Sequence, residues 1–321
     1  MTDIVLPRLH WSPQSWLRPL GETGIQVSAV TFGASPLGGL PEADPVAGHE
    51  RGVDVVRQVL ASPLRTIDTA NGYRASERLI GEAIADSGGL ADDAVVITKV
   101  DPLDGDFSGE RVRRSVAESK QRLGLDELPL VMLHDPESYD FAAMTGPGGA
   151  VETLRELRSA GVIGHIGLAA GDTRVMRRYL DLGCFEVVLV HNRWTLVDHS
   201  AAELIEEARR NDVAVMNAAV YGGGILADPT GSTSYGYRPA SAQTLQAIEQ
   251  MADACRDFDT DLRTAALQWS VRDQRVATTV VGFTRGERIE SLLGALTDEL
   301  PDELWQRLCE LLPESSNWLD H

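Results

Sequence analysis

Cysteine and long apolar runs are scarce in this chain of 321 residues. Its three cysteines are Cys184, Cys255 and Cys309, and none belongs to a Cys-x-x-Cys pair. This small number of cysteines argues against a disulfide framework and favours a reducing compartment. We therefore expect a cytoplasmic protein. No apolar stretch is long enough to cross a bilayer, and the N-terminus lacks the pattern of a signal peptide.

Positive charge is also in short supply. The chain has 29 basic and 48 acidic residues, which gives a formal net charge of −19. This balance opposes long-range attraction to duplex nucleic acid or to an anionic membrane, and we expect neither as a partner. A local basic pocket for an anionic cofactor is compatible with it. The sequence leaves the oligomeric state open.

Lysine is the rarest charged residue. Only two of the 29 basic residues are lysines, Lys99 and Lys120, and the others are arginines. A GC-rich coding sequence can produce such a bias. Lys120 lies within a helical pattern and is interpreted as solvated surface. Lys99 ends an apolar run, where a compact ammonium group in place of arginine indicates a chemical role.

Short apolar or β-branched runs alternate with helical periodicities along most of the chain. Glycine follows several of the expected helices, as suits their left-handed last residue. The expected strands are 28–33, 65–68, 94–99, 130–134, 164–168, 186–190, 213–217 and 278–281. The expected helices include 110–123, 151–160, 173–182, 200–210 and 242–257.

Eight strand–helix units in roughly 250 residues are typical of an α/β fold of the (β/α)8 TIM-barrel type. A doubly wound sheet is the competing architecture, but no GxGxxG motif follows a strand near the start. The segment 17–27 is expected to form a hairpin that plugs the barrel bottom, and 301–312 an extra C-terminal helix. Without a linker or repeat, we expect a single domain over 1–321, with an N-terminal extension at 1–16.

Polar residues end three consecutive expected strands. These are Asp68, Lys99 and His134, and Tyr73 lies on the loop after the first strand. The carboxyl ends of barrel strands meet on one face, and neighbouring strands lie ~4.8 Å apart, so these side chains can meet. An adjacent ammonium lowers the pKa of a phenol, and a carboxylate keeps that ammonium charged and oriented. A neutral imidazole would position a carbonyl oxygen.

Such a set suits proton exchange with a carbonyl being reduced or an alcohol being oxidised. Taken singly, each of the four residues has an ordinary structural explanation. A strand-end acid or base is commonly a cap or an ion pair, and a tyrosine commonly packs in the core. Four of them on one expected face favour a functional site.

The chain resembles the aldo-keto reductase family over nearly its whole length. The matching segments include "LGETGIQVSAVTFGASPLGG", "IDTANGYRASERLIGEAI", "VVITKV", "SGERVRRSVAESKQRLGLDELPLVMLHDPE" and "RELRSAGVIGHIGLAAG". The resemblance implies a barrel that transfers a hydride between NAD(P)(H) and an aldehyde, ketone or sugar hydroxyl without a metal. It implies a tetrad of Asp68, Tyr73, Lys99 and His134, with Tyr73 as the general acid/base. "HDPE" and "HNRWTLVDHS" are similar to the aldose 1-dehydrogenase-like branch, which oxidises sugars to lactones.

The resemblance also implies contacts to the cofactor. The family's Ser-Asn pair, which holds the nicotinamide carboxamide, is replaced here by Ala169-Ala170, so Asp172 or His191 would substitute. Tyr221 is the nearest aromatic for stacking on nicotinamide. The implied cofactor set is Gly33, Ala34, Ala169, His191, Tyr221, Gly222, Gly223, Gly224, Gly282, Thr284, Arg285 and Arg288.

NADP(H) is favoured over NAD(H) because Arg285 and Arg288 can hold a 2′-phosphate bidentately. An exposed helix residue is the ordinary explanation for Arg288, and a mobile loop is the ordinary explanation for the glycines at 222–224. Ser35 and Trp194 are the expected substrate contacts. Trp194, and Trp11 with less weight, can equally be core residues.

Two functional hypotheses remain at this point. The first is an oxidoreductase acting on a small carbonyl or sugar substrate. The second is a non-catalytic, nucleotide-sensing barrel with a relic site, motivated by the loss of the Ser-Asn pair. The physiological substrate and the direction of the reaction depend on the loops 1–18, 101–109, 135–149 and 222–241, whose folding the sequence does not specify.

Overall fold

Eight parallel strands close into a barrel in the computed structural model, which describes residues 16–321. Around the barrel their order is β12-β3-β4-β5-β6-β7-β8-β9, so the first and last strands pair and complete the ring. The expected (β/α)8 architecture is therefore confirmed. The strands are β3 (Val30–Gly33), β4 (Thr66–Asp68), β5 (Val95–Val100), β6 (Leu130–His134), β7 (His165–Ala170), β8 (Val187–His191), β9 (Ala214–Ala218) and β12 (Thr278–Gly282).

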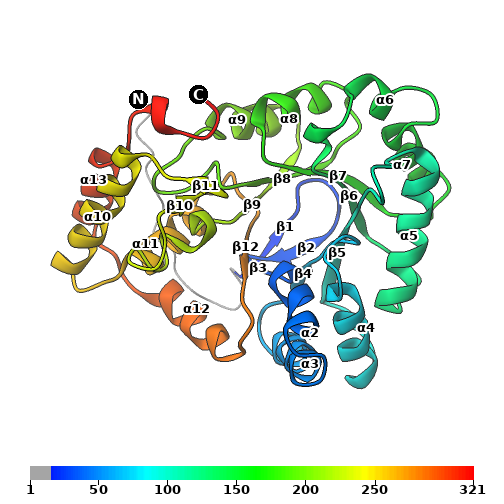
Figure 1. The fold of residues 1–321 in the computed structure, drawn as a ribbon, viewed down its shortest axis with the longest axis horizontal. Coiled ribbons are helices and arrows are strands. Elements are labelled where there is room, and N and C mark those ends of the chain that lie inside the picture. Colours follow the sequence, from blue (N-terminus) through cyan, green and yellow to red (C-terminus); the bar gives the residue numbers. More distant parts are fainter. Residues whose placement is uncertain (1–15) are drawn as a thin grey trace.

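Helices surround the barrel as an outer layer (Figure 1). Their apolar faces pack on the outward side chains of the strands, as expected for amphipathic helices. None of the helices within 16–321 is both long and apolar enough to span a membrane. The helices are α2 (Leu40–Ala43), α3 (Ala47–Leu60), α4 (Ser76–Asp86), α5 (Gly109–Leu123), α6 (Phe141–Thr145), α7 (Ala150–Ser159), α8 (Thr173–Leu180), α9 (Ala202–Arg210), α10 (Ala242–Asp257), α11 (Leu262–Arg272), α12 (Glu287–Thr297) and α13 (Asp302–Glu310).

The expected N-terminal hairpin is present as β1 (Leu17–Pro19) and β2 (Gln26–Ser28). Leu20 and Val27 of this hairpin belong to the cluster of inward-facing strand residues that fills the barrel. The hairpin therefore closes one end of the barrel interior, and function is left to the other end. Apart from Trp16, the N-terminal extension expected at 1–16 lies outside the described residues, as does Trp11.

The long loops contain short elements that the sequence did not predict. Residues 135–149 include α6 and the 3₁₀ turn η2 (Pro136–Ser138), and 222–241 includes η3 (Gly222–Gly224) with the hairpin β10 (Ser234–Tyr235) and β11 (Arg238–Pro239). Another 3₁₀ turn, η1 (Ser35–Gly39), follows β3 directly. The extra C-terminal helix is α13, which packs against α10. Of these segments, η1, η2 and η3 follow the carboxyl ends of β3, β6 and β9.

Candidate active site

Asp68, Lys99 and His134 end or nearly end three adjacent strands, β4, β5 and β6. Lys99 is 1% exposed, and its Nζ donates to both carboxylate oxygens of Asp68 at 2.8 Å. Its third hydrogen bond goes to the carbonyl of Thr69, also at 2.8 Å. Because the ammonium's three donors are satisfied, a buried charge is tolerated at this position.

Tyr73 joins this pair from the loop between β4 and α4. The Nζ of Lys99 lies 4.7 Å from the centroid of the Tyr73 ring. The phenol oxygen of Tyr73 lies 3.4 Å from Nε2 of His134, and the two rings meet edge to face. The four residues that the sequence singled out thus form one cluster, with the Tyr73 ring beside the ammonium and its oxygen beside the imidazole.

The acidity of Tyr73 differs from the expectation. Burial of the phenol is the largest influence and raises the pKa of Tyr73 to about 12. The charge of Lys99 does lower the pKa, as expected, but Asp68 and Asp135 work against it. The net pKa therefore lies above the usual value and not below it, because desolvation of a phenolate outweighs one ammonium already neutralised by Asp68.

Burial alone lowers the pKa of Lys99, but the charges of Asp68 and Tyr73 raise it more, so the pKa is raised above its usual value. The ammonium is therefore retained at neutral pH. It acts on the phenol as a fixed positive charge.

Asp101 belongs to the same cluster and was missed in the sequence. Its Oδ1 lies 2.7 Å from Nδ1 of His134, and its Oδ2 accepts a hydrogen bond from the backbone N–H of Gly72 at 2.6 Å. Since a carboxylate only accepts, Nδ1 carries the proton, and in the neutral ring Nε2 is an acceptor for the Tyr73 hydroxyl. In this tautomer His134 orients the phenol, and the expected contact of its imidazole with a substrate carbonyl oxygen stays a prediction.

The loop that carries Tyr73 is held tightly on the side of η1. The hydroxyl of Ser76 donates to the carbonyl of Ala34 at 3.1 Å, and Ala34 donates to the carbonyl of Asp68 at 2.8 Å. Gly38 packs so closely that a Cβ there would lie 2.1 Å from the carbonyl oxygen of Tyr73. The position of Tyr73 therefore depends on a glycine in η1.

The glycines proposed for close approach to a cofactor have suitable backbones. Gly222, Gly223 and Gly224 have φ values of 60°, 83° and 110°, a region that favours glycine. Nothing lies within 4 Å of a Cβ built on Gly223 or Gly224, so these stretches of backbone are open. A bound phosphate can approach such a segment closely.

The other residues expected around the nucleotide lie at neighbouring strand ends. Gly33 and Gly282 are the last residues of β3 and β12 and are paired in register. Ala34 is buried directly after β3, and Thr284 is half-buried after β12. Arg285 and Arg288 are exposed, and within residues 16–321 neither forms an ion pair.

The replacement of the Ser-Asn pair leaves a buried apolar strand end. Ala169 and Ala170 are buried in β7. Asp172 is occupied as the N-cap of α8, where it accepts hydrogen bonds from the N–H groups of Arg174 and Val175. His191 ends β8 and is half-buried, with Nδ1 at 3.1 Å from the side-chain nitrogen of Asn192. Of the two suggested substitutes, His191 is the less constrained, since its Nε2 lies 3.7 Å from Asp135, beyond hydrogen-bond distance.

The residue expected to stack on nicotinamide and the two expected to contact substrate differ in their exposure to solvent. Tyr221 precedes η3 and packs partly against the core, and burial raises the pKa of its phenol above the usual value. Ser35 is exposed on η1. Trp194 is 1% exposed and packs against Trp269 of α11. The structure therefore favours the core-packing interpretation of Trp194 over a substrate contact.

Three further polar side chains gather beside His134. Asp135, Glu137 and His191 each offer a ligand atom, and these atoms all lie within 4.8 Å of one another, a spacing that can hold a cation. The backbone N–H of Gly171 also donates to Glu137 at 2.9 Å. The sequence analysis assigned no role to Asp135 or Glu137, although both lie in the quoted segment "HDPE".

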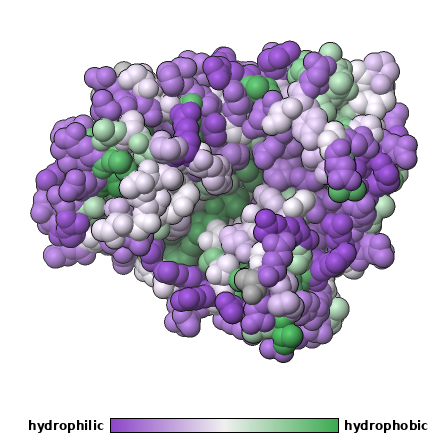
Figure 2. Space-filling model, viewed as in Figure 1, coloured by the Kyte–Doolittle hydropathy of each residue, from purple (hydrophilic) through white to green (hydrophobic). Residues whose placement is uncertain are grey.

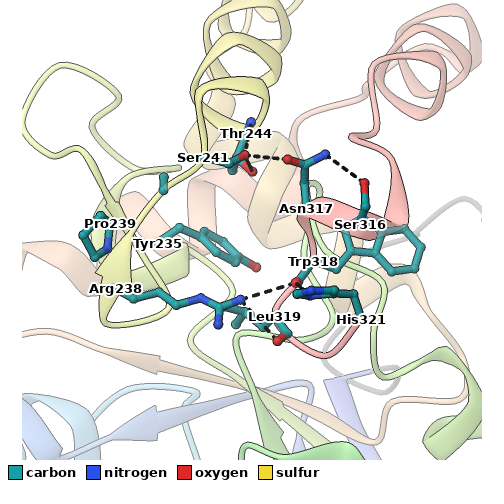
Figure 3. Close-up of a pocket in the computed structure, with 11 residues that line it drawn as sticks. Tyr235, Arg238, Pro239, Ser241, Thr244, Ser316, Asn317, Trp318, Leu319 and His321 are labelled. Atoms are coloured by element: carbon teal, nitrogen blue, oxygen red, sulfur yellow. Dashed lines mark hydrogen bonds between the residues drawn. The ribbon is translucent and has the colours of Figure 1, made fainter.

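The surface over the barrel is hollowed near the middle of the ring of helices, and the floor of the hollow is apolar (Figure 2). A second cavity of about 270 Å³ lies between the β10–β11 hairpin, the start of α10 and the C-terminal segment (Figure 3). There Arg238 donates to the carbonyls of Trp318 and Leu319, and Ser241 to the side chain of Asn317. These contacts fasten the C-terminal segment to the hairpin.

Comparison with known proteins extends over most of the chain. A model of the Aldo/keto reductase family matches residues 30–313. Pyridoxal 4-dehydrogenase from Microbacterium luteolum is 30% identical over 338 residues, covering 91% of this chain and 96% of that protein. L-galactose dehydrogenase from Arabidopsis thaliana is 28% identical over 289 residues, or 88% of each protein.

D-threo-aldose 1-dehydrogenase from a Pseudomonas species is 30% identical over 208 residues, covering 64% of this chain and 63% of that protein. Among solved structures, the holo form of an aldo-keto reductase from Bacillus halodurans superimposes with a TM-score of 0.76 at 22% identity. It covers 95% of this chain and 98% of that one, and supports the fold.

Proposed function

Since this chain belongs to the aldo/keto reductase family, we propose that Tyr73 is the general acid/base of its reaction. Its relatives include aldose 1-dehydrogenases, and the chain is an oxidoreductase. The proposed reaction is hydride transfer between NAD(P)(H) and a small aldehyde, ketone or sugar hydroxyl. One observation carries the proposal. The Tyr73 oxygen lies 3.4 Å from His134 Nε2, on a ring 4.7 Å from the Lys99 ammonium.

The side chains have distinct tasks in this proposal. Tyr73 gives a proton to the substrate oxygen during reduction and takes one from the substrate hydroxyl during oxidation. Lys99 stabilises the phenolate that exists while the proton is away, and Asp68 keeps Lys99 in place. His134, oriented by Asp101, holds the Tyr73 hydroxyl in position.

The residues at the strand ends fit a dinucleotide. The open, left-handed backbone at Gly223 and Gly224 suits a pyrophosphate. The guanidiniums of Arg285 and Arg288, which form no ion pair within residues 16–321, suit a phosphate. The nicotinamide, when bound, supplies or accepts the hydride. The two arginines favour NADP(H) over NAD(H). Fluorescence titration with NADPH and NADH measures this preference directly.

A Tyr73→Phe variant tests the acid/base assignment. We expect it to bind the cofactor with unchanged affinity and to lose at least about a thousandfold in kcat, because the barrel keeps its shape but the proton donor is gone. Turnover would be followed by nicotinamide absorbance over a panel of aldoses, pyridoxal and simple aldehydes.

The matched control is Tyr179→Phe, which removes a buried hydroxyl that has no hydrogen-bond partner among the described residues. This variant should keep the parental kcat. If Tyr73→Phe turned substrates over at the parental rate, the acid/base assignment would be wrong.

The buried Ala169-Ala170 pair motivates a second candidate function, a barrel that senses the nucleotide without turning substrate over. Such a protein would bind NAD(P)H in the same titration but show no hydride transfer with any substrate in the panel. Turnover of one substrate by the parent protein, abolished in Tyr73→Phe, would exclude this candidate.

A further inference from the structure

Asp135 lies beside the reacting groups, and its carboxylate is not part of the proposed proton exchange. It follows His134 at the end of β6, and its backbone N–H extends the strand pairing by donating to the carbonyl of Ala169 at 2.8 Å. Its φ of 42° is left-handed, a conformation that aspartate and asparagine adopt more readily than most residues. The chain thus turns at Asp135 directly after His134.

The carboxylate of Asp135 lies between two imidazoles. One oxygen is 3.8 Å from Nε2 of His134, and the other is 3.7 Å from Nε2 of His191. Both distances are longer than a hydrogen bond, and the side chain is 54% exposed. The carboxylate therefore retains the capacity to accept a hydrogen bond from a bound molecule.

The charge of this group is maintained. Burial works toward a higher pKa, but the imidazoles of His191 and His134 outweigh it, so the pKa of Asp135 lies below its usual value. A negative charge at this place attracts hydrogen-bond donors and repels anions. It also contributes to the raised pKa of Tyr73, which indicates that its field reaches the phenol.

The position relative to Tyr73 identifies which part of a substrate would meet the carboxylate. His134 Nε2 is the common neighbour, at 3.4 Å from the Tyr73 oxygen and 3.8 Å from Asp135. A substrate oxygen that exchanges a proton with Tyr73 must lie within hydrogen-bond distance of the Tyr73 oxygen. Because Asp135 and the Tyr73 oxygen flank the same imidazole nitrogen, a hydroxyl on the carbon adjacent to the reacting carbon can reach the Asp135 carboxylate.

An exposed aromatic ring lies on the other side of His191. Tyr237 lies between β10 and β11, is 77% exposed, and its ring centroid is 6.0 Å from that of His191. The aromatic face can pack on the C–H groups of a ligand ring, and the carboxylate can accept hydrogen bonds from hydroxyls at the edge of that ring.

From this arrangement we propose that Asp135 is a specificity-determining residue: it accepts a hydrogen bond from a substrate hydroxyl on the carbon next to the reacting carbon. The site then selects neutral, hydroxylated carbonyl compounds and sugars, and discriminates against substrates with an apolar or anionic group there. This inference rests on the proposed function, because it assumes that Tyr73 marks the reacting oxygen.

Three small aldehydes that differ only beside the carbonyl test the proposal. Glycolaldehyde has a hydroxyl on the adjacent carbon, acetaldehyde has a methyl group, and glyoxylate has a carboxylate. We expect the parent protein to show a kcat/KM for glycolaldehyde at least tenfold above that for acetaldehyde, because an unfilled charged acceptor penalises the analogue. Glyoxylate should be the poorest of the three.

The Asp135→Asn variant keeps the size of the side chain and suits the left-handed backbone. We expect the glycolaldehyde-to-acetaldehyde ratio of kcat/KM to fall at least tenfold, mainly through KM, and the glyoxylate-to-acetaldehyde ratio to rise. Asp212→Asn is the matched control, since Asp212 is also exposed and left-handed, with a φ of 55°, but precedes β9 at the far end of the barrel. It should leave both ratios unchanged.

The outcomes separate the two proposals. Parental ratios in Asp135→Asn, or equal losses for all three aldehydes, would refute the role of Asp135 while leaving the proposed function intact. A parent protein that prefers acetaldehyde would do the same. A parent that turns over neither these aldehydes nor any sugar would refute the proposed function and this inference together.

Discussion

Lys99, buried against Asp68, serves both the stability of the fold and the chemistry of the site. A charge taken out of water is tolerated only when its partners are complete, and here two carboxylate oxygens and one carbonyl meet three N–H donors. Arginine could not reproduce this contact, because its planar fork is wider than one ammonium. The persistence of lysine in an arginine-rich chain has this physical explanation.

Replacing Lys99 by methionine should therefore affect folding as well as turnover. We expect Lys99→Met to lower the free energy of unfolding by about 3–5 kcal/mol, because the carboxylate of Asp68 is left buried and uncompensated. Urea denaturation followed by circular dichroism measures this loss.

The double variant Lys99→Met/Asp68→Asn removes the orphaned charge and should be more stable than Lys99→Met alone. A double variant that is less stable than Lys99→Met would show that the uncompensated carboxylate of Asp68 is not the cause of the lost stability. Both variants should be inactive.

At the scale of elements, η1 is the part that fixes the catalytic loop. Gly38→Ala would place a Cβ 2.1 Å from the carbonyl of Tyr73, so either η1 or the Tyr73 loop must shift. We expect kcat to fall by about a hundredfold, the effect of a misplacement near 1 Å in a reacting group. Steady-state kinetics with the best substrate of the panel would show the loss.

Gly294→Ala is the control for this substitution. Gly294 lies in α12, and nothing lies within 4 Å of a Cβ built there. Alanine should be neutral or slightly stabilising at this position because it favours helix. Parental kcat in Gly38→Ala would indicate that the loop does not depend on η1.

The eight strands were predictable because each is a short apolar run bounded by turn residues, and the observed bounds lie close to the expected ones. Helix α11 was not among the predicted helices. Nearly all its residues are buried, including Gln268 and Arg272, so it lacks the one-sided apolar pattern that reveals a helix. The predicted helix at 242–257 is α10, which packs on α13.

The candidate site was predictable where it depends on strand ends. Asp101 could also have been found, since it lies two residues after Lys99 and so on the same side of the strand. The raised pKa of Tyr73 could not, because it depends on how deeply the loop buries the phenol. The proximity of Tyr237 to His191 depends on the β10–β11 hairpin, which sequence pattern did not indicate.

For the molecule as a whole, stability should depend on pH through His199. Its ring stacks on Trp269 with an interplanar angle of 9°, and burial lowers the pKa of His199 to about 4. The unfolded chain binds a proton near pH 6.5 but the folded protein does not, so stability falls as the pH decreases from 6.5 toward 4.

Between pH 7 and pH 5 the loss attributable to His199 should be roughly 2 kcal/mol. His199→Phe retains an aromatic ring and removes the titration. As the pH decreases, the parent should therefore lose unfolding free energy that the variant retains, so the variant becomes more stable relative to the parent. Urea denaturation at several pH values checks this, and a difference that stays constant would rule out the neutral, buried state of His199.

The pairing of β3 with β12 has a consequence for biosynthesis. Val30 and Thr279 are neighbours in the sheet but about 250 residues apart in the chain, a connection of very high contact order. A ribosome adding 5–20 residues per second needs roughly 12–50 s to make the stretch between them. Throughout that interval one edge of the nascent sheet has unpaired backbone groups, so the growing polypeptide is exposed to aggregation and is a natural client for chaperones that shield unpaired strands.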